Sequence, residues 1–370
     1  MHDSYKTLRR STWTVCLACV LLIVGTLFSS SASAAHGVDL AYHDGDRWVT
    51  ATANGEVVRR FRPFWSTTFD GRLFAAHVKN PAGDVVDRVI GFGPRNGERR
   101  FVIENASLPV AVKNGEKLAF LPDTEGERDR QGNSVWMRKQ GGRIHKIVQF
   151  SNGGNLPGVE TGFDGGAGVL EYAFDRRGSR LVVTEGNDFD TFEYDIWLVK
   201  VRSGAARRMT TGERSRFPSL SPNGRRLAYV RENAHCGGPF PGYRSGTLKI
   251  TPTRGRPRPR NLIEGTCDRY FTEPRWVGRR SLVAVRMVRA SPGHYDRDLV
   301  KINVVSKTTE TLVDSSDVIW FSASPARKLI AFGRRGHRRV FVYDMRTGVR
   351  RRIPGSEAAI GARVRGDHRL

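Results

Sequence analysis

Cysteine is scarce in this sequence, which contains four among 370 residues. Two of them, Cys16 and Cys19, lie in an N-terminal segment that we expect to be removed. The rest of the chain keeps only Cys236 and Cys267, so it has no framework of several disulfides. An even pair of cysteines in an oxidising compartment predicts one disulfide bond between them.

Acidic residues are also few, with 37 Asp and Glu against 61 Lys and Arg and a net charge of +24. Loss of the first 34 residues removes three basic side chains and one acidic one, which leaves +22. This excess predicts an anionic partner such as a wall polymer, phospholipid head groups or an acidic polysaccharide, and no specific nucleic acid. Alternatively, the 50 arginines against 11 lysines reflect a GC-rich genome.

Two catalytic motifs are missing from the sequence. It has neither the G-x-S-x-G nucleophile elbow of serine hydrolases nor the S-x-D-x-G-x-x-W box of sialidases. These absences disfavour both classes of enzyme, and no residue is predicted to be catalytic.

The N-terminus has the pattern of a secretory signal peptide. Lys6, Arg9 and Arg10 precede an apolar run from Trp13 to Phe28, and small residues follow up to Ala34. We therefore expect a signal peptide over residues 1–34 and export to the extracellular, periplasmic or cell-wall space. An uncleaved membrane anchor is the alternative, but the run is short and the cleavage site follows it directly. The route, Sec or twin-arginine, stays open.

A strand–turn–strand pattern recurs through residues 35–370, which we expect to form one domain. In each copy a turn and a basic residue precede an apolar strand, and a second hairpin follows. Successive copies lie 45, 63, 46, 55 and 47 residues apart. A period near 45 residues with four short strands is typical of a β-propeller, whose blades bury their faces against neighbouring blades. The strands are anchored by Leu73, Leu118, Leu181, Leu227, Leu282 and Leu329.

One copy of the pattern carries a family resemblance. The stretch "DIWLVKVRSGAARRMTTGERSRFPSLSPNGRRLAYVREN", residues 195–233, resembles the WD40-like repeat of TolB-type propellers. Asn223 replaces the Asp that is usual in the family's pattern, and Ala326 and Arg327 stand where that pattern has Asp and Gly. The resemblance implies an all-β propeller fold. It does not imply TolB's activity, because TolB has a separate α/β domain and the strands here begin near Val38.

The two ends of the repeated region predict how many blades there are. The N-terminal part has three strands and lacks an inner one, whereas the C-terminal part offers one more strand before Leu370. We therefore predict seven four-stranded blades, the last closed by one C-terminal strand that joins three N-terminal strands. The alternative of six blades leaves both end segments unpaired.

Long insertions indicate which end of the propeller could bind a ligand. They join the second and third strands of their blades, at residues 122–133, 185–194, 231–246 and 288–298. Cys236 lies in one of these loops, and Cys267 lies between two blades at the same end, so a disulfide between them is reasonable. Loops on a rigid scaffold often carry binding residues. The candidates are His235, Phe240, Tyr243, His294 and Tyr295.

Metal binding at this end is a weaker hypothesis. His43, His235 and His294 could converge on a metal ion, although they belong to separate blades and fit unrelated surface residues better. Asp188, Asp190, Glu193 and Asp195, with Glu185 nearby, could bind Ca²⁺, but their spacing matches no known loop. We therefore predict no metal and no cofactor.

Arginines recur in or beside the fourth strand of the blades. Charge on an outer edge discourages pairing between molecules, and it also surrounds the propeller with positive potential. We expect Arg350, Arg351 and Arg352 to contact a polyanion. The others are Arg59, Arg60, Arg99, Arg100, Arg207, Arg208, Arg258 and Arg260.

These features predict an exported, monomeric, non-enzymatic binding module for an envelope protein or an anionic polymer. A different class remains open as the alternative, a metal-dependent lyase or hydrolase that acts on an acidic polysaccharide. Convergence of the three histidines beside an arginine-lined cleft would favour the enzyme.

Overall fold

The computed structural model describes most of the chain from Val38 to Val364, and residues 38–370 form one compact unit. Within that span it leaves out residues 45–46, 62–65, 71–72, 79–87, 114, 123–133, 151–167, 187–193, 213, 236–243, 292–293, 315–317, 327, 336, 355 and 357–360. The predicted signal peptide therefore lies outside the described residues.

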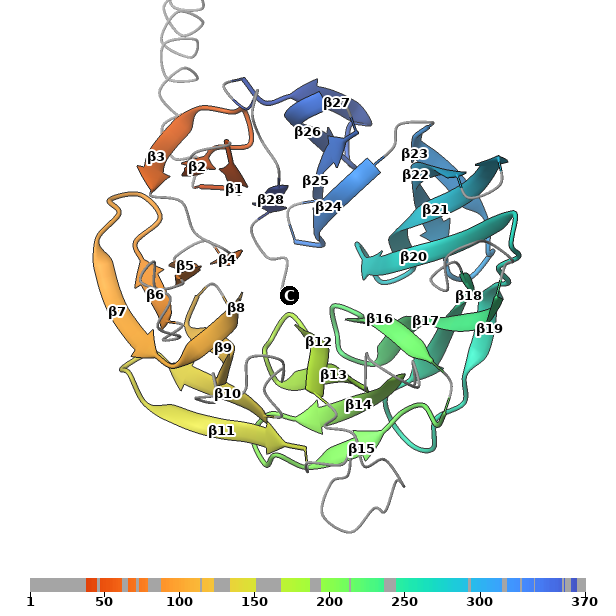
Figure 1. Cartoon of the computed structure of the whole chain (residues 1–370), viewed down its shortest axis with the longest axis horizontal. Helices are drawn as coiled ribbons and strands as arrows, with labels where there is room; N and C mark the ends of the chain where they lie inside the picture. Colours follow the sequence, from red (N-terminus) through yellow and green to blue (C-terminus); the bar gives the residue numbers. More distant parts are fainter. Residues whose placement is uncertain are drawn as a thin grey trace, which may run out of the picture. The chain divides into compact units, whose positions relative to one another are not determined.

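Seven four-stranded antiparallel sheets form the blades of a β-propeller, arranged in a ring (Figure 1). Blade 1 contains β28 (Gly361–Val364), β1 (Leu40–His43), β2 (Trp48–Ala51) and β3 (Val57–Phe61). Blade 2 contains β4 (Ser66–Asp70), β5 (Leu73–Val78), β6 (Arg88–Phe92) and β7 (Arg99–Glu104). Blade 3 contains β8 (Ala106–Val112), β9 (Lys117–Pro122), β10 (Ser134–Lys139) and β11 (Ile144–Gln149).

The remaining blades follow in chain order. Blade 4 contains β12 (Gly168–Phe174), β13 (Arg180–Gly186), β14 (Tyr194–Lys200) and β15 (Ala206–Arg208). Blade 5 contains β16 (Ser215–Leu220), β17 (Arg226–His235), β18 (Arg244–Pro252) and β19 (Arg260–Ile263). Blade 6 contains β20 (Arg269–Trp276), β21 (Ser281–Ser291), β22 (His294–Asn303) and β23 (Thr309–Val313). Blade 7 contains β24 (Val318–Ser324), β25 (Leu329–Arg334), β26 (His337–Asp344) and β27 (Val349–Arg352).

Blade 1 closes the ring with strands from both ends of the domain. The C-terminal strand β28 pairs antiparallel with β1, so that Gly361 lies opposite His43 and Val364 lies opposite Leu40. The prediction of seven blades closed by one C-terminal and three N-terminal strands is therefore confirmed. The six-bladed alternative is wrong, because both end segments are paired.

The repeated turn is explained by its backbone geometry. In Ser221-Pro222-Asn223-Gly224, Gly224 has a φ of 64° and donates its amide to the Ser221 carbonyl at 2.7 Å. Glycine adopts this left-handed conformation without a steric penalty. A Cβ at Gly224 would also lie 3.0 Å from Asp175 of blade 4, so the turn needs glycine for close packing of blades 4 and 5.

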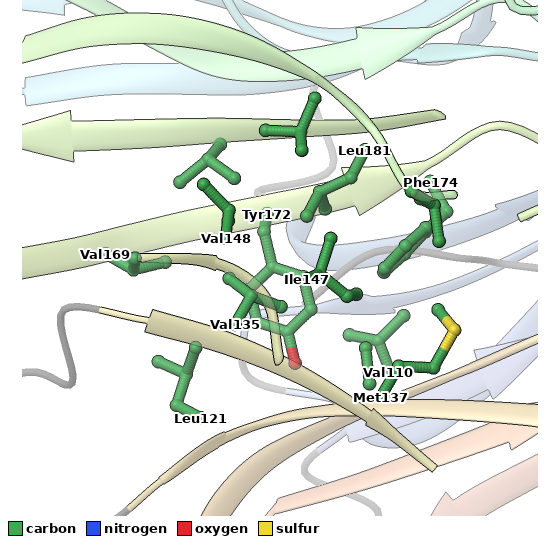
Figure 2. Packing of buried hydrophobic residues seen from close by; sticks show 14 of the residues in the cluster. Val110, Leu121, Val135, Met137, Ile147, Val148, Val169, Tyr172, Phe174 and Leu181 are labelled. Carbon is green, nitrogen blue, oxygen red and sulfur yellow. The ribbon is translucent and has the colours of Figure 1, made fainter. Parts of the chain in front are cut away.

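The hydrophobic core lies largely between adjacent blades. The cluster between blades 3 and 4 includes Met137 of β10, Tyr172 of β12 and Leu181 of β13, each fully buried (Figure 2). All six anchor leucines predicted from the sequence are at most 4% exposed. Because each blade covers the face of the next, the ring arrangement buries surfaces that a single blade would leave in water.

Strands extend into one of the predicted insertions. Over residues 288–298, β21 continues to Ser291 and β22 begins at His294, with Arg289 opposite Tyr295 and a register shift between Arg289 and Ser291. The two strands satisfy each other's backbone groups there. Among the described residues, no helix is long and apolar enough to cross a membrane.

Candidate functional site

The hairpin turns of each blade gather at one end of the propeller. In blades 3 to 7 the turn between the third and fourth strands donates a backbone amide to the turn between the first and second strands. In blade 4, for example, the Val201 amide donates to the Ser179 carbonyl at 3.1 Å, and in blade 5 the Thr253 amide donates to the Arg225 carbonyl at 3.0 Å. These bonds join both sets of turns into one surface, which we call the turn face.

Exposed basic side chains dominate the turn face of four consecutive blades, 3 to 6. Every one of these turns contributes at least one exposed Lys or Arg, and together they contribute fifteen. The set is Lys113, Lys139, Arg143, Arg176, Arg177, Lys200, Arg202, Arg225, Arg226, Arg254, Arg256, Arg258, Arg279, Arg280 and Lys307.

Few carboxylates oppose this charge. The same turns contain two, Glu116 and Asp175. Glu116 forms an ion pair with Lys113 at 2.7 Å. Asp175 is buried, and it accepts hydrogen bonds from Ser179 and from the Arg180 amide at 3.0 Å. Apart from Lys113, no member of the basic set forms an ion pair with a carboxylate in the described part of the chain.

Two titratable groups respond to the positive potential of this surface. Burial lowers the pKa of Lys117, and the nearby charges of Lys113 and Lys139 lower it further, while Asp175 and Glu116 oppose them. Burial likewise lowers the pKa of His145, with smaller contributions from Lys139, Arg143 and Lys117. The direction is the one that neighbouring positive charges produce in a cationic group.

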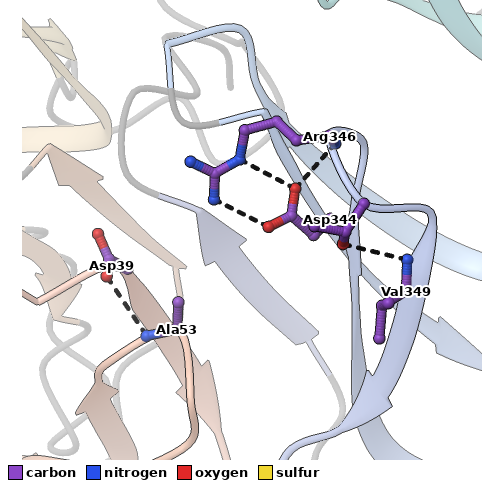
Figure 3. Close-up of polar contacts among 6 residues, drawn as sticks. Asp39, Ala53, Asp344, Arg346 and Val349 are labelled. Carbon is purple, nitrogen blue, oxygen red and sulfur yellow. Dashed lines mark hydrogen bonds and ion pairs between the residues drawn. The ribbon is translucent and has the colours of Figure 1, made fainter.

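Blade 7 presents a different arrangement at its outer turn. The Arg346 guanidinium forms an ion pair with Asp344 at 2.8 Å (Figure 3). Hydrogen bonds from Arg346 lower the pKa of Asp344, with burial opposing them. The charge of this arginine is thus neutralised locally. In blades 3 to 6, by contrast, Lys113 alone among the fifteen basic side chains has a carboxylate partner in the described part of the chain.

Other basic residues of the repeat connect neighbouring blades. The Lys117 ammonium of blade 3 donates to the Gly178 carbonyl of blade 4 at 3.3 Å. The Arg180 guanidinium of blade 4 donates to Thr253 Oγ1 of blade 5 at 2.6 Å. Lys328 of blade 7 donates to the Val277 carbonyl of blade 6 at 2.8 Å. In blades 3, 4 and 7 the basic residue before the apolar strand therefore also has a structural role.

The outer-strand arginines divide into two groups. Some are engaged within the protein: Arg207 donates to the Thr253 carbonyl of blade 5 at 2.9 Å, Arg208 forms an ion pair with Asp195, and Arg260 donates to the Val304 carbonyl at 3.4 Å. Of the predicted polyanion contacts in β27, Arg350 and Arg352 are exposed and Arg351 is half-buried. Their contact with a polyanion stays a prediction.

The opposite end carries the connections between second and third strands and between blades, and we call it the loop face. The candidates Cys236, Phe240 and Tyr243 lie outside the described residues, as does the side chain of His235. Tyr295 is 8% exposed, its ring packs edge-on against Tyr270, and its hydroxyl donates to the Cys267 carbonyl at 3.0 Å. These contacts give Tyr295 a packing role in blade 6.

We predict that Cys236 and Cys267 are joined in the exported protein. Cys267 is disulfide-bonded in the structure, between β19 and β20 on the loop face. Peptide mass spectrometry of the unreduced protein should find the two cysteines in one linked peptide pair, and reduction should separate them. Detection of two free thiols would contradict the prediction, with a Cys267→Ser variant as the control for nonspecific linkage.

The histidines of the loop face remain apart in the described structure. His43 ends β1 in blade 1 and packs edge-on against Trp48 at 5.5 Å, whereas His294 begins β22 in blade 6 and lies 3.8 Å from Asp296. Among the described residues, no group of three His, Cys, Asp or Glu side chains could hold a metal ion. Asp188, Asp190 and Glu193 lie outside those residues.

Glu185 and Asp195 lie opposite each other where β13 and β14 reach the loop face. Glu185 is 4% exposed, and its Oε1 is buried without a hydrogen-bond partner. Burial raises the pKa of Glu185 to about 8, the Asp195 carboxylate adds to the rise, and Trp197 and Arg208 oppose it. Asp195 is engaged by Arg208 and by the Thr210 hydroxyl at 3.0 Å. Because the pKa of Glu185 is raised, we expect this carboxyl to be protonated at neutral pH.

Sequence reasoning missed the turn face as a site. The signal was present, because every repeat showed a basic residue near its first turn. The bonds that join the inner and outer turns connect residues 17 to 28 positions apart in sequence, and only the pairing of strands places these turns at the same end.

Neither a protein-family model nor a curated protein sequence matches this chain. Among solved structures it is similar to the tricorn protease, with a TM-score of 0.59 and 11% identity over 89% of this chain and 34% of that one. It spans about a third of that protease. It is also similar to an oligogalacturonate lyase in complex with manganese, with a TM-score of 0.56 and 13% identity over 85% of this chain and 84% of that one.

TolB from Acinetobacter baumannii is a further similar structure, with a TM-score of 0.49 and 13% identity over 79% of this chain and 66% of that one. At such identities the likenesses concern the fold alone. The propeller fold that the resemblance of residues 195–233 implied is therefore confirmed: the chain is a seven-bladed β-propeller, and its fold is similar to folds found in the tricorn protease and the oligogalacturonate lyase.

Proposed function

We propose that this protein is an exported, non-enzymatic binding module that docks a linear anionic polymer of the cell envelope on its turn face. The observation that carries the proposal is the set of fifteen exposed basic side chains on blades 3 to 6, opposed by two carboxylates that are already engaged. A surface with this imbalance attracts polyanions over a distance comparable with the Debye length, about 8 Å at physiological salt.

The distribution of the charges favours an extended ligand. They belong to eight turns on four consecutive blades, so a compact anion would contact only a few of them. A flexible polymer can engage many weak contacts at once, and its avidity grows with the number of contacts. An envelope protein is the alternative partner.

The experiment compares polymer binding by two arginine variants. The variant Arg176→Gln, Arg177→Gln, Arg225→Gln and Arg226→Gln removes four charges from the inner turns of blades 4 and 5. At about 1 kcal/mol for each basic residue near an anionic surface, we expect affinity for polygalacturonate and for long-chain polyphosphate to fall about a hundredfold or more. Binding is measured by calorimetry at low salt, and wild-type affinity should fall steeply as salt rises.

The outer strand of blade 7 provides the comparison. Substitution of Arg350, Arg351 and Arg352 by Gln removes three exposed or half-exposed charges outside the turn face, and we expect only partial weakening. Equal losses in both variants would contradict a specific role for the turn face. New reducing or unsaturated ends in polygalacturonate after incubation with the wild-type protein and a divalent metal would instead support the lyase or hydrolase alternative.

A further inference from the structure

Arg275 is a buried guanidinium at the junction of blades 6 and 7. It is the penultimate residue of β20, the innermost strand of blade 6, and 8% of its surface is exposed. Its Nε and Nη1 atoms are buried and have no hydrogen-bond partner in the described part of the molecule. The guanidinium instead faces the ring of Phe321 in β24 of blade 7, with Cζ 5.7 Å from the ring centroid.

The carboxylates of the described strands in these two blades all have other partners. In blade 6, Glu273, two residues before Arg275, lies 3.6 Å from Arg297. The other pairs are Asp296 with His294, Asp298 with Arg286, Glu310 with Lys301, and Asp344 with Arg346. No carboxylate in this group forms an ion pair with Arg275.

The backbone just before Arg275 keeps the nearest carboxylate away. A β-bulge interrupts the pairing of β20 with β21 between Thr272 and Arg275, and Glu273 has a φ of 52° at that point. A left-handed φ is unfavourable for a residue other than glycine, so the bulge is held by its surroundings. It separates Glu273, which engages Arg297, from Arg275, which faces blade 7.

Burial of an unpaired guanidinium is costly, and contact with an aromatic ring offsets only part of the cost. The effective penalty for a buried ion is several kcal/mol, whereas a desolvated cation over an aromatic ring contributes about 2 kcal/mol. A bound anion would offset the rest of the free-energy cost of burying this guanidinium. A planar fork of N–H groups suits the paired oxygens of a carboxylate or a phosphate group.

We propose that Arg275 binds a small oxyanion, a carboxylate or phosphate group, at the junction of blades 6 and 7. The site differs from the turn-face set in that its guanidinium is buried, although two members of that set, Arg279 and Arg280, lie in a turn next to it in sequence. Lys328 and the exposed Arg279 and Arg280 belong to the turns that immediately follow the inner strands of this junction, and they add positive potential there.

The test is thermal unfolding of the whole protein in phosphate, acetate and chloride at equal ionic strength. For the wild type we expect phosphate or acetate to raise the Tm above its value in chloride by about 3 °C or more, because a ligand that binds only the folded state stabilises it. The response to phosphate and to acetate distinguishes the two oxyanions.

Two substitutions test whether the anion-dependent rise in Tm depends on Arg275. Arg275→Met removes the charge at similar length, so it should abolish the difference between salts and leave the Tm in chloride at or above that of the wild type. Arg275→Lys keeps the charge but loses the fork, so it should fold and show a reduced rise. The pair Arg225→Gln and Arg226→Gln is the control: it should keep the full rise even though it weakens polymer binding.

Three results would overturn the proposal. The wild type could show no anion-specific rise, Arg275→Lys could keep the full rise, or Arg275→Met could lower the Tm equally in all three salts, as a purely structural residue would. Because the control variant separates this response from polymer binding, failure of either proposal leaves the other intact.

Discussion

Deletion of residues 361–370 should lower the Tm of this propeller by about 5 °C or more. The deletion removes β28, which supplies the inner strand of blade 1 and pairs with β1 from Leu40 to His43. Without it, the backbone edge of β1 loses its hydrogen-bond partners, and Leu40, Ala41 and Tyr42, which are 0% exposed, lose part of their cover. Several lost backbone bonds and the exposed apolar surface together cost a few kcal/mol.

A shorter deletion separates ring closure from a general effect of trimming the chain. Removal of residues 365–370 alone leaves all four paired positions of β28 in place, so its Tm should stay close to that of the full chain. Both proteins are compared by differential scanning calorimetry at the same pH and salt. The same Tm for the two deletions would show that pairing of β28 contributes little to stability.

Glu185→Gln should stabilise the protein increasingly as pH rises from about 4.5 to about 8. The pKa of Glu185 is raised from its ordinary value of 4.5 to about 8 in the folded state, chiefly by burial. Below pH 4.5 the carboxyl is protonated in both states and has no pH-dependent effect. Between these values the unfolded chain releases the proton and the folded chain retains it, so wild-type stability falls by up to about 1.4 kcal/mol per pH unit.

Glutamine does not titrate, so the variant avoids this loss. The difference in unfolding free energy between Glu185→Gln and the wild type should therefore grow through this window and level off above pH 8. Urea unfolding from about pH 5 to 9 measures it. The control is Glu56→Gln at an exposed turn, which replaces a glutamate outside the core by the same residue. A constant difference for Glu185→Gln would show that Glu185 is ionised in the folded protein.

The amino-acid sequence by itself determined the repeat, the fold and its closure. The period near 45 residues, the glycine turns and the anchor leucines are local features, and every blade except blade 1 is built from strands that are neighbours along the chain. Local pairing of this kind can be predicted from a sequence because a turn and its two flanking strands contain the information for one hairpin. Closure of the ring could be predicted because the N-terminal part lacked the inner strand of a blade and the C-terminal part contained one more strand.

The tertiary structure alone decided which charges act together. Arg177 and Arg202 are far apart in sequence, yet the bond from the Val201 amide to the Ser179 carbonyl places their turns side by side. Arg208 and Arg225 look alike in the sequence, but the first is neutralised by Asp195 and the second is exposed. Glu273 lies two residues before Arg275 in the sequence, but it pairs with Arg297, and an irregularity in strand pairing lies between Thr272 and Arg275. Whether a charge is paired, buried or exposed depends on contacts between strands and between blades, and no pattern along a single strand records those contacts.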